Sequence, residues 1–491
     1  MYQRGPGQSG TAGHPARSRR RGLLVVTLGL VVLTVAVLQT AVVPILGVIA
    51  DQLGASDVAV SWAVTANLLA AAAATPLIGR LADLHRKKRV LLIVLVVVLI
   101  GSLLAATTSS LPLLIAARVL QATSYALYPI SIAILREEIP EDRMGSAMSV
   151  LSGTLGFGGG AGLVVVGLLM SGDADYHRVF WLSTGFTAAV LVAAAVVVPD
   201  RPRSGSGGID WLGALGLAAG LSAVLLALTQ GTTWGWASAG TIGSACGGLV
   251  VLIGWWLWER RAARPLVSIR MLTQRTMLFT NLATISVGMG LYFAFLGITQ
   301  FVQIPHDVAG YGFGASVLEA SVLYLLPGAL AGFVVALISG RFIDRFGAKP
   351  VLMVGAAAGI AGFLFIALAH SAVWQVITAN VLANVYISLG YGALPALVVS
   401  EVDAAQTGVA TSMNAIARTV GSSTAAALVA VLLASTSRTG IPSEGGFVVI
   451  FFGGAATALA ALGLIAMTRS TGGRRSVEAE YESRAMNHEW G

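Results

Sequence analysis

Charge is scarce in this sequence. Only 11% of its 491 residues are charged, whereas 56% are hydrophobic, and the mean hydropathy is +0.83. A soluble protein of this length needs far more charged side chains to cover its surface. Several apolar runs exceed the roughly 18 residues that are needed to cross a bilayer core. The sequence therefore predicts an all-α polytopic membrane protein and excludes a soluble globular enzyme.

Cysteine and the usual ligand-binding motifs are also missing. Cys246 is the single cysteine, so a disulfide framework is excluded. The sequence contains no Walker motif and no cluster of His and Cys at metal-binding spacing. The glycine-rich run at residues 153–162 lies inside an apolar stretch, where small residues let helices approach closely. We therefore expect no catalytic residue, metal or cofactor, and a source of energy other than ATP.

The apolar stretches predict fourteen transmembrane helices joined by short loops. With the N-terminus placed in the cytoplasm, all but four of the 30 Lys and Arg residues fall in cytoplasmic loops or tails. The positive-inside rule thus predicts that both termini are cytoplasmic. The net charge of +8 is spread over these loops, so no nucleic-acid partner is expected. The predicted helices lie near residues 22–48, 58–79, 89–108, 111–135, 145–170, 179–198, 211–229, 239–258, 277–303, 316–339, 350–369, 373–399, 406–435 and 446–468.

One basic loop occurs twice, as GRLADLHRKK at residues 79–88 and as GRFIDRFGAK at residues 340–349. Each copy stands between two long apolar stretches, which indicates two homologous membrane halves. The helix count then leaves two helices between the halves. The predicted segments are a basic cytoplasmic tail (1–21), an N-terminal six-helix bundle (22–200), a linker with two inserted helices (201–275), a C-terminal six-helix bundle (276–470) and a second cytoplasmic tail (471–491).

Over residues 22–470 the chain resembles the major facilitator superfamily, specifically its fourteen-helix drug:proton antiporter branch. The two basic loops are similar to motif A of the family, and RVLQA at 118–122 with Pro129 is similar to its arginine-bearing motif of helix 4. DWLG at 210–213 is typical of the inserted hairpin, and TGVATSMN at 407–414 with Arg418 is similar to helix 13.

The resemblance implies a multi-pass secondary transporter, monomeric, in the cytoplasmic membrane of a bacterium. It implies export of amphipathic drugs or small metabolites in exchange for protons by alternating access, and hence antibiotic resistance. Two departures keep alternatives open. Gln39 stands where the branch carries an acidic residue, and the stretch 153–162 lacks the Gly-Pro pair associated with antiporters. The alternative that these departures favour is a dedicated metabolite exporter or uptake carrier of the same fold. A membrane sensor or scaffold that transports nothing is a separate alternative.

The motif A residues are the candidate gate. The resemblance implies that Asp83 meets the N-terminus of helix 13, around residues 406–408, where free N–H groups and the positive end of the helix dipole hold a carboxylate. Such a contact would close the cytoplasmic side in the outward-facing state. The alternatives are a simple capping carboxylate and, for the basic residues, membrane topology alone. The candidate gating residues are Gly79, Asp83, Arg86, Lys87, Gly340, Asp344, Arg345 and Lys349.

Two arginines within predicted spans are candidates for the transport pathway, because a charge inside a membrane normally faces a polar cavity or a partner. At about 100° per residue, one helix face carries Arg118, Gln121, Tyr125 and Pro129. Asn414 and Arg418 lie four residues apart on another helix and also share a face. The alternative in both cases is a structural arginine that hydrogen-bonds neighbouring backbone.

Proton coupling requires a titratable group, and carboxylates within the apolar spans are rare. Glu319 is the best candidate, and in a partly apolar site its pKa would rise. The alternative is a surface glutamate at a loop end. Polar side chains within other spans are candidates for the substrate cavity, although amides also serve as hydrogen bonds between helices. The candidate cavity residues are Gln39, Asn67, Asn281, Gln300, Asn384 and Tyr391.

Overall fold

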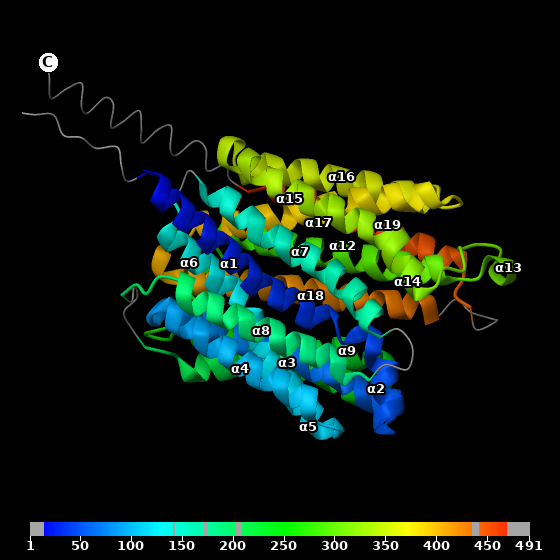
Figure 1. The fold of residues 1–491 in the computed structure, drawn as a ribbon, viewed down its shortest axis with the longest axis horizontal. Coiled ribbons are helices and arrows are strands. Elements are labelled where there is room, and N and C mark those ends of the chain that lie inside the picture. The colour runs from blue at the N-terminus through cyan, green and yellow to red at the C-terminus, as the bar shows by residue number, and fades with distance from the viewer. Residues whose placement is uncertain (1–13, 141–142, 171–174, 203–207, 435–440, 469–491) are drawn as a thin grey trace, which may run out of the picture.

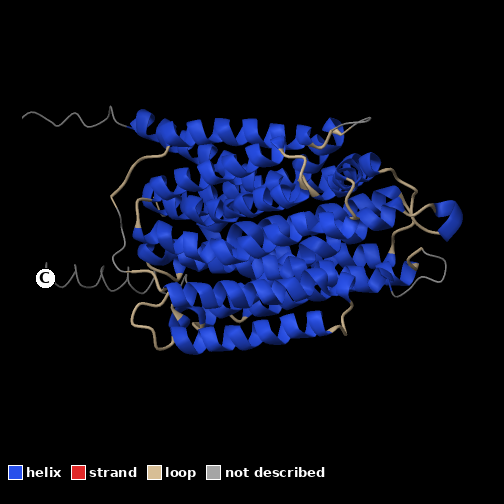
Figure 2. Cartoon of the chain, turned by 90° about the horizontal axis from the view of Figure 1, so that it is seen from below, coloured by secondary structure: helices blue, strands red, loops and turns tan. Residues whose placement is uncertain are grey.

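The computed structural model of the chain describes residues 14–140, 143–170, 175–202, 208–434 and 441–468. Its helices run side by side along the long axis, and the loops gather at the two ends (Figures 1 and 2). We name the end at which α1 begins and α19 ends the terminal end, and the opposite one the far end. The predicted C-terminal tail, residues 1–13 of the predicted N-terminal tail, and residues 203–207 of the linker lie outside the described residues.

Within the described residues, fourteen helical segments are long and apolar enough to span a membrane, which confirms the predicted number. The first span combines α1 and α2, the fourth combines α5 and α6, and each of the others contains one long helix. The helices are α1 (His14–Thr40), α2 (Leu46–Leu53), α3 (Asp57–Leu84), α4 (Lys87–Thr107), α5 (Leu111–Gln121), α6 (Leu127–Glu138), α7 (Met144–Leu169), α8 (His177–Val197), α9 (Trp211–Trp234), α10 (Ala239–Glu259), α11 (Ile269–Leu272), α12 (Arg275–Gln303), α13 (His306–Ala309), α14 (Val317–Glu319), α15 (Leu326–Phe346), α16 (Ala348–Leu368), α17 (Val373–Ser400), α18 (Thr407–Ala434) and α19 (Glu444–Ala466).

Short polar side chains start several of these helices. The side chains of Ser56, Asp210 and Ser238 accept hydrogen bonds from the third backbone N–H that follows each of them, at the starts of α3, α9 and α10. These caps satisfy N–H groups that have no partner inside the helix. The fourth span is interrupted by a 3-10 turn at Ala122–Ala126, although its sequence predicted one continuous helix. The turn changes which side chains share a face, because a 3-10 helix has about three residues per turn.

The glycine-rich run lies in α7, which packs against α1 on one side and α15 on the other. A Cβ atom on Gly158 would approach Leu33 and Ala36 of α1, and one on Gly160 would approach Ala329 of α15 at 3.0 Å. The predicted close approach of helices at this run is therefore present. The same pattern joins α3 to α18, because a Cβ on Gly408 would lie 2.6 Å from the backbone oxygen of Gly79. Close backbone contacts of this kind are how helices associate without a hydrophobic driving force.

The two helices between the predicted bundles form a hairpin at the side of the molecule. Its first helix, α9, packs against α3 and α18, and the amide of Gln230 donates a 2.8 Å hydrogen bond to the hydroxyl of Thr65. The second helix, α10, packs mainly on α9 and is the least buried of the fourteen spans. The hairpin therefore covers the α3–α18 seam.

Candidate functional site

A cavity of about 210 Å³ lies between the helices of residues 22–200 and those of residues 276–470. Helices α1, α3, α5, α7, α12, α15, α17 and α18 all contribute to its wall. Seven of the predicted pathway and cavity residues line it, namely Gln39, Asn67, Arg118, Tyr125, Asn384, Tyr391 and Arg418. The folded chain thus brings together polar residues that are distant in sequence, at one site within the apolar bundle.

Arg118 is 1% exposed and is held by three oxygen atoms. Its Nε donates to the carbonyl of Ala63 at 3.3 Å, and its Nη1 donates to the carbonyl of Leu38 at 3.2 Å and to the side chain of Gln121 at 2.7 Å. The backbone oxygen of Arg118 in turn accepts a 2.7 Å bond from Asn67. Arg118 therefore ties α5 to α1 and α3, which is the structural interpretation left open by the sequence, while one edge of it still borders the cavity.

Arg418 has a different environment. Its guanidinium carbon lies 4.8 Å from the ring centroid of Tyr391 and 5.4 Å from that of Tyr128. The hydroxyl of Tyr128 bonds to Ser152 at 2.9 Å and donates to the backbone oxygen of Tyr391 at 3.4 Å. Arg418 therefore lies in the cavity wall, beside a contact that joins the two halves. Asn414 does not join it there, because its amide donates to Asn281 at 3.0 Å and to Thr284 at 2.7 Å.

Three further candidates lie outside the cavity wall. Gln121 points toward Ser102, to which its amide donates at 3.0 Å, because the 3-10 turn separates it from Tyr125. Asn281 is engaged with Asn414 between α12 and α18, as the hydrogen-bonding alternative expected. Gln300 is exposed on α12. Sequence reasoning also missed six polar or aromatic residues that do line the cavity, namely Thr40, Tyr292, Phe295, Ser321, Asn380 and Ser388.

No carboxylate of the described residues lines this cavity. The acidic residues that the structure describes lie in loops or in the first or last turn of a helix. The site therefore has two guanidinium groups and no acidic side chain opposite them.

Glu319 lies at the far end, exposed, and not in the cavity. Its carboxylate accepts a 2.9 Å bond from the backbone N–H of Ser316, whose hydroxyl accepts a 3.2 Å bond from the backbone N–H of Glu319. The bond from the backbone N–H of Ser316 holds the pKa of Glu319 below its usual value. This is the opposite of the expected rise, because the residue is solvated and forms a reciprocal cap at a helix start.

This position leads to a first prediction. The substitution Glu319→Gln should leave the initial rate of transport within about twofold across the neutral pH range, since a solvated cap with a lowered pKa stays ionised there. Initial rates of substrate efflux from cells or proteoliposomes, measured at several pH values, check it. A shifted or flattened pH profile in the variant would restore Glu319 as a proton-coupling residue.

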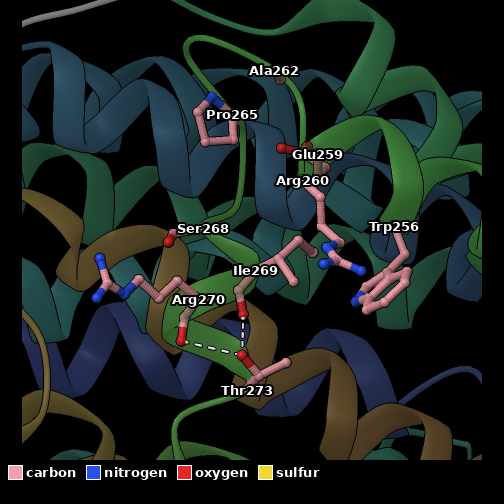
Figure 3. A pocket seen from close by; sticks show the side chains of 9 residues that line it. All are labelled: Trp256, Glu259, Arg260, Ala262, Pro265, Ser268, Ile269, Arg270 and Thr273. Atoms are coloured by element: carbon pink, nitrogen blue, oxygen red, sulfur yellow. Dashed lines mark hydrogen bonds between the residues drawn. The ribbon is translucent and has the colours of Figure 1, made fainter.

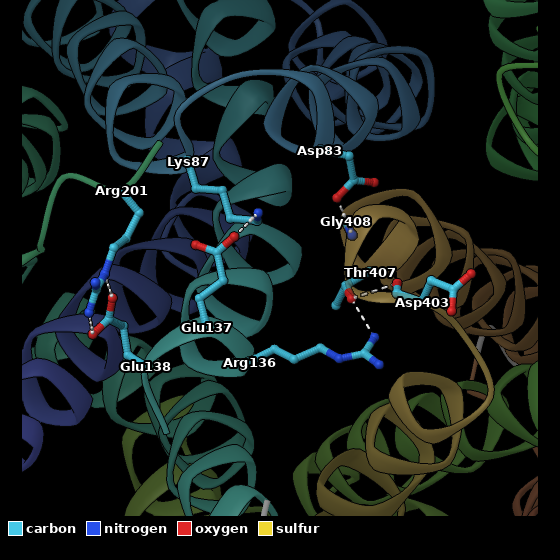
Figure 4. A network of polar contacts seen from close by, with 9 residues as sticks. All are labelled: Asp83, Lys87, Arg136, Glu137, Glu138, Arg201, Asp403, Thr407 and Gly408. Carbon is cyan, nitrogen blue, oxygen red and sulfur yellow. Dashed lines mark hydrogen bonds and ion pairs between the residues drawn. The ribbon is translucent and has the colours of Figure 1, made fainter. Parts of the chain in front are cut away.

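Asp83, in the last turn of α3, is fully buried against the start of α18. Its two carboxylate oxygens accept hydrogen bonds from the backbone N–H groups of Gly408 at 2.8 Å (Figure 4) and of Val409 at 2.9 Å. These are two of the N–H groups that the helix itself leaves unpaired, and they lie at the positive end of its dipole. The contact that the resemblance implies is thus present, and it joins the two halves at the terminal end.

The second copy of the loop makes a related contact on the other side of the molecule. Asp344, near the end of α15, accepts a 3.1 Å bond from the backbone N–H of Ser146 and a second from its hydroxyl, in the first turn of α7. A side chain at Gly340 would collide with the backbone of Ser146, just as one at Gly408 would collide with that of Gly79. The two contacts are related as the two halves are, but Asp344 is exposed whereas Asp83 is buried.

Polar residues near the end of α6 form further contacts at the terminal end (Figure 4). Arg136, which sequence reasoning missed as a site residue, donates to the hydroxyl of Thr407 and to the backbone oxygen of Val402, each at 2.6 Å. The next residue, Glu137, pairs with the buried Lys87 at the start of α4. Arg136 therefore bridges the halves, whereas Lys87 stabilises the N-terminal half alone.

The other motif A residues lie at the terminal surface. Arg86 forms an exposed 2.8 Å ion pair with Asp200. Lys349 donates to the backbone oxygens of Ala466 at 2.9 Å and Thr468 at 2.6 Å, which places a positive charge at the negative end of α19. Arg345 lies over the ring of its neighbour Phe346. The contacts of these basic residues are local and do not join the two halves.

A larger hollow of about 490 Å³ lies at the terminal end of the inserted hairpin (Figure 3). Its wall includes Trp256, with Arg260 stacked over the indole at 4.6 Å, and the short helix α11. None of its lining residues lines the central cavity. The hollow is an open surface feature of the loop between α10 and α12, so the central cavity remains the candidate transport site.

The chain matches known transporters over most of its length. The family model described as "Major Facilitator Superfamily" matches residues 28–426. The tetracenomycin C resistance and export protein of Streptomyces glaucescens is 28% identical over 87% of this chain and 79% of that protein. A multidrug resistance protein B homolog of Mycobacterium tuberculosis is 27% identical over 77% of this chain and 70% of its own length.

Solved structures agree on the fold. The crystal structure of the human organic anion transporter MFSD10 superposes with a TM-score of 0.61 at 16% identity, covering 92% of this chain and 100% of that one. Such low identity shows the fold alone. The family match and the fourteen spans together show that this chain is a multi-pass membrane transporter, not an enzyme, and that it belongs to the major facilitator superfamily.

Proposed function

We propose that this chain exports small amphipathic molecules, either drugs or metabolites, from a bacterial cytoplasm by alternating access. The observation that carries the proposal is the polar and aromatic cavity between the two halves. Hydrogen bonds join the halves between this cavity and the terminal end. If the terminal end is cytoplasmic, as the positive-inside rule predicts, the cavity is separated here from the cytoplasm. Opening those contacts would admit a substrate from that side.

Proton exchange is the coupling that we propose for this export. The described part of the cavity wall offers no carboxylate, so the coupling role falls to Asp83. A charged Asp83 holds α3 to the start of α18, and a protonated Asp83 holds it more weakly, because the charge–dipole term disappears. Proton binding would thus favour the state that opens at the terminal end. The names of the relatives, which refer to resistance and export, support the direction of transport.

The proposal is tested in everted membrane vesicles and in a deletion strain. Vesicles that contain the full chain should show a substrate-dependent change of internal pH, and deletion of the gene should increase susceptibility to at least one exported compound. A screen of compound libraries against deletion and overexpression strains identifies that compound. Vesicles without any such pH change, from a strain without any change in susceptibility, would exclude drug:proton exchange.

A dedicated metabolite carrier of the same fold is the second candidate function. It is favoured by Gln39, a neutral residue that lines the cavity where the antiporter branch carries an acid. Accumulation of a labelled metabolite by right-side-out cells that express the chain, absent from control cells, would identify uptake in place of export.

A further inference from the structure

We propose that the substrate of this carrier is a compact aromatic anion, whose carboxylate or similar acidic group pairs with Arg418. The inference rests on the transport function proposed above and specifies the charge of the molecule that is carried. It follows from which charges in the cavity have partners and which have none.

Arg418 is the charge that lacks a partner. Among the described residues it forms no ion pair and no hydrogen bond, and its guanidinium lies over the rings of Tyr128 and Tyr391. Arg418 is half-buried and lines the cavity, and a guanidinium in such a site between apolar helices is stabilised by an anion. Cation–π contacts offset part of this cost but leave the N–H donors unused. The planar guanidinium is suited to bind a carboxylate through two parallel hydrogen bonds.

The remaining charges of the cavity act in the same direction. Arg118 is held by carbonyl and amide oxygens, none of which is negatively charged, so its positive charge also remains uncompensated. The buried carboxylate of Asp83 is bound to the start of α18 at the terminal end and does not line the cavity. A cation in this cavity would therefore meet two like charges and no carboxylate among the described residues. An anion would be attracted by both arginines.

The rest of the wall defines the body of the ligand. Tyr125, Tyr292 and Phe295 present aromatic rings to the cavity, and Gln39 has a side-chain amide without a hydrogen-bond partner in the described structure. The volume of about 210 Å³ is smaller than the pockets of roughly 300–1,000 Å³ that hold drug-sized ligands. A molecule of one or two fused aromatic rings, with one polar substituent within reach of Gln39, matches this space.

Position gives the pairing a mechanical consequence. Arg418 lies against the Tyr128–Tyr391 contact, which joins the two halves beside the cavity. An anion that pairs with the unused N–H groups of Arg418 from the cavity side neutralises the positive charge that the two tyrosine rings attract. The charge of the substrate would in this way affect the Tyr128–Tyr391 contact, which has to break and re-form during transport.

The test uses the purified full-length chain and three probes of one shape: 2-naphthoate, the neutral 2-naphthamide and the cationic 2-naphthylmethylammonium. Displacement of radiolabelled naphthoate gives the three affinities. We expect naphthoate to bind at least about tenfold more tightly than either analogue. Arg418→Gln should remove this preference by weakening naphthoate about tenfold while changing naphthamide less than about twofold. Arg418→Lys keeps the charge and should retain part of the preference, so it tests the proposal even if the Gln variant fails to fold.

Arg270→Gln, at an exposed arginine outside the cavity, is the matched control and should bind all three probes as the parent does. Tighter binding of the ammonium probe, binding of none of the three, or a preference for naphthoate that survives in Arg418→Gln would each overturn the proposal. Release of the bound probe from loaded proteoliposomes separates the two levels of inference. If the cationic probe binds and is released, the proposed transport stands and the anionic substrate is excluded. If naphthoate binds but is never released, the proposed transport is excluded and the anion-binding site stands.

Discussion

Replacement of Asp83 by Asn is expected to reduce transport at least about tenfold while the protein still inserts in the membrane. An Asn side chain has one acceptor oxygen, so one of the two N–H groups at the start of α18 loses its partner, and the charge–dipole attraction is lost as well. A charge-assisted contact of this kind is worth about 2 kcal/mol, and its loss changes the ratio of closed to open states by up to about thirtyfold. The variant should therefore rest open at the terminal end.

Asp344→Asn is the matched control, because it removes the related contact of the second loop at an exposed site. Its effect on the transport rate should be several times smaller, since exposed charged contacts contribute little. Opening is measured by maleimide labelling of Ser149→Cys, a buried position where Ser149 and Ser339 meet across the seam, in a chain whose Cys246 is replaced by Ser. Equal labelling rates in the parent and in Asp83→Asn, together with unchanged transport, would reduce the loop to a topological signal.

Arg118→Leu is expected to destabilise the protein more than any other single change in the cavity. The substitution leaves the carbonyls of Leu38 and Ala63 without the donor that ties α5 to α1 and α3. Each lost hydrogen bond between membrane helices costs about 0.6–2 kcal/mol, and a buried acceptor left unpaired adds to this, for a total of about 2–5 kcal/mol. The unfolding temperature of the purified protein in detergent and the monodisperse fraction after solubilisation should both fall.

The comparison with Arg418 separates the two arginines. Arg418→Gln removes no hydrogen bond of the described structure and should unfold close to the parent temperature, while it alters anion binding. Arg118→Lys should recover part of the stability lost in Arg118→Leu, because an ammonium can still donate to a carbonyl. If Arg118→Leu were as stable as the parent, the carbonyl contacts would be incidental and Arg118 would belong to the transport pathway alone.

An anionic substrate also changes the energetics of export. Moving one negative charge out of a cell whose interior is about 100 mV negative releases about 2.3 kcal/mol. A carrier of cations has to recover this amount from the ion that it exchanges. A neutral Gln39, and a cavity wall to which the described residues contribute no carboxylate, agree better with a substrate that the membrane potential already drives outward.

The number of spans could be predicted from the sequence because crossing a bilayer demands long apolar helices, and charge marks their ends. The contact of Asp83 with the start of α18 followed from the motif and from the chemistry of helix ends. The 3-10 turn at Ala122–Ala126 could not be predicted, because its residues are compatible with an α-helix and the change comes from packing. Tyr125 lies within that turn and lines the cavity, whereas Gln121, just before the turn, does not.

The sequence also could not assign the partners of the polar residues within the spans. Asn281 and Gln300 resemble cavity amides in sequence, yet one pairs with Asn414 and the other is exposed on α12. The two arginines look equivalent in sequence, and only the fold shows that backbone oxygens surround Arg118 while tyrosine rings cover Arg418. Which face of a helix meets a neighbour depends on tertiary packing, and one sequence does not contain that information directly.

The central claim is that the two halves alternate about the cavity, with the contact between Asp83 and α18 as the lock at one end. Electron–electron distance measurements test it with nitroxide pairs at exposed sites, Arg89 and Phe346 at the terminal end and Asp51 and Val308 at the far end. We expect two populations of distances at each end. Asp83→Asn should increase the population with the longer distance at the terminal end and the population with the shorter distance at the far end. A single distance at both ends, unchanged by Asp83→Asn, would contradict alternating access in this chain.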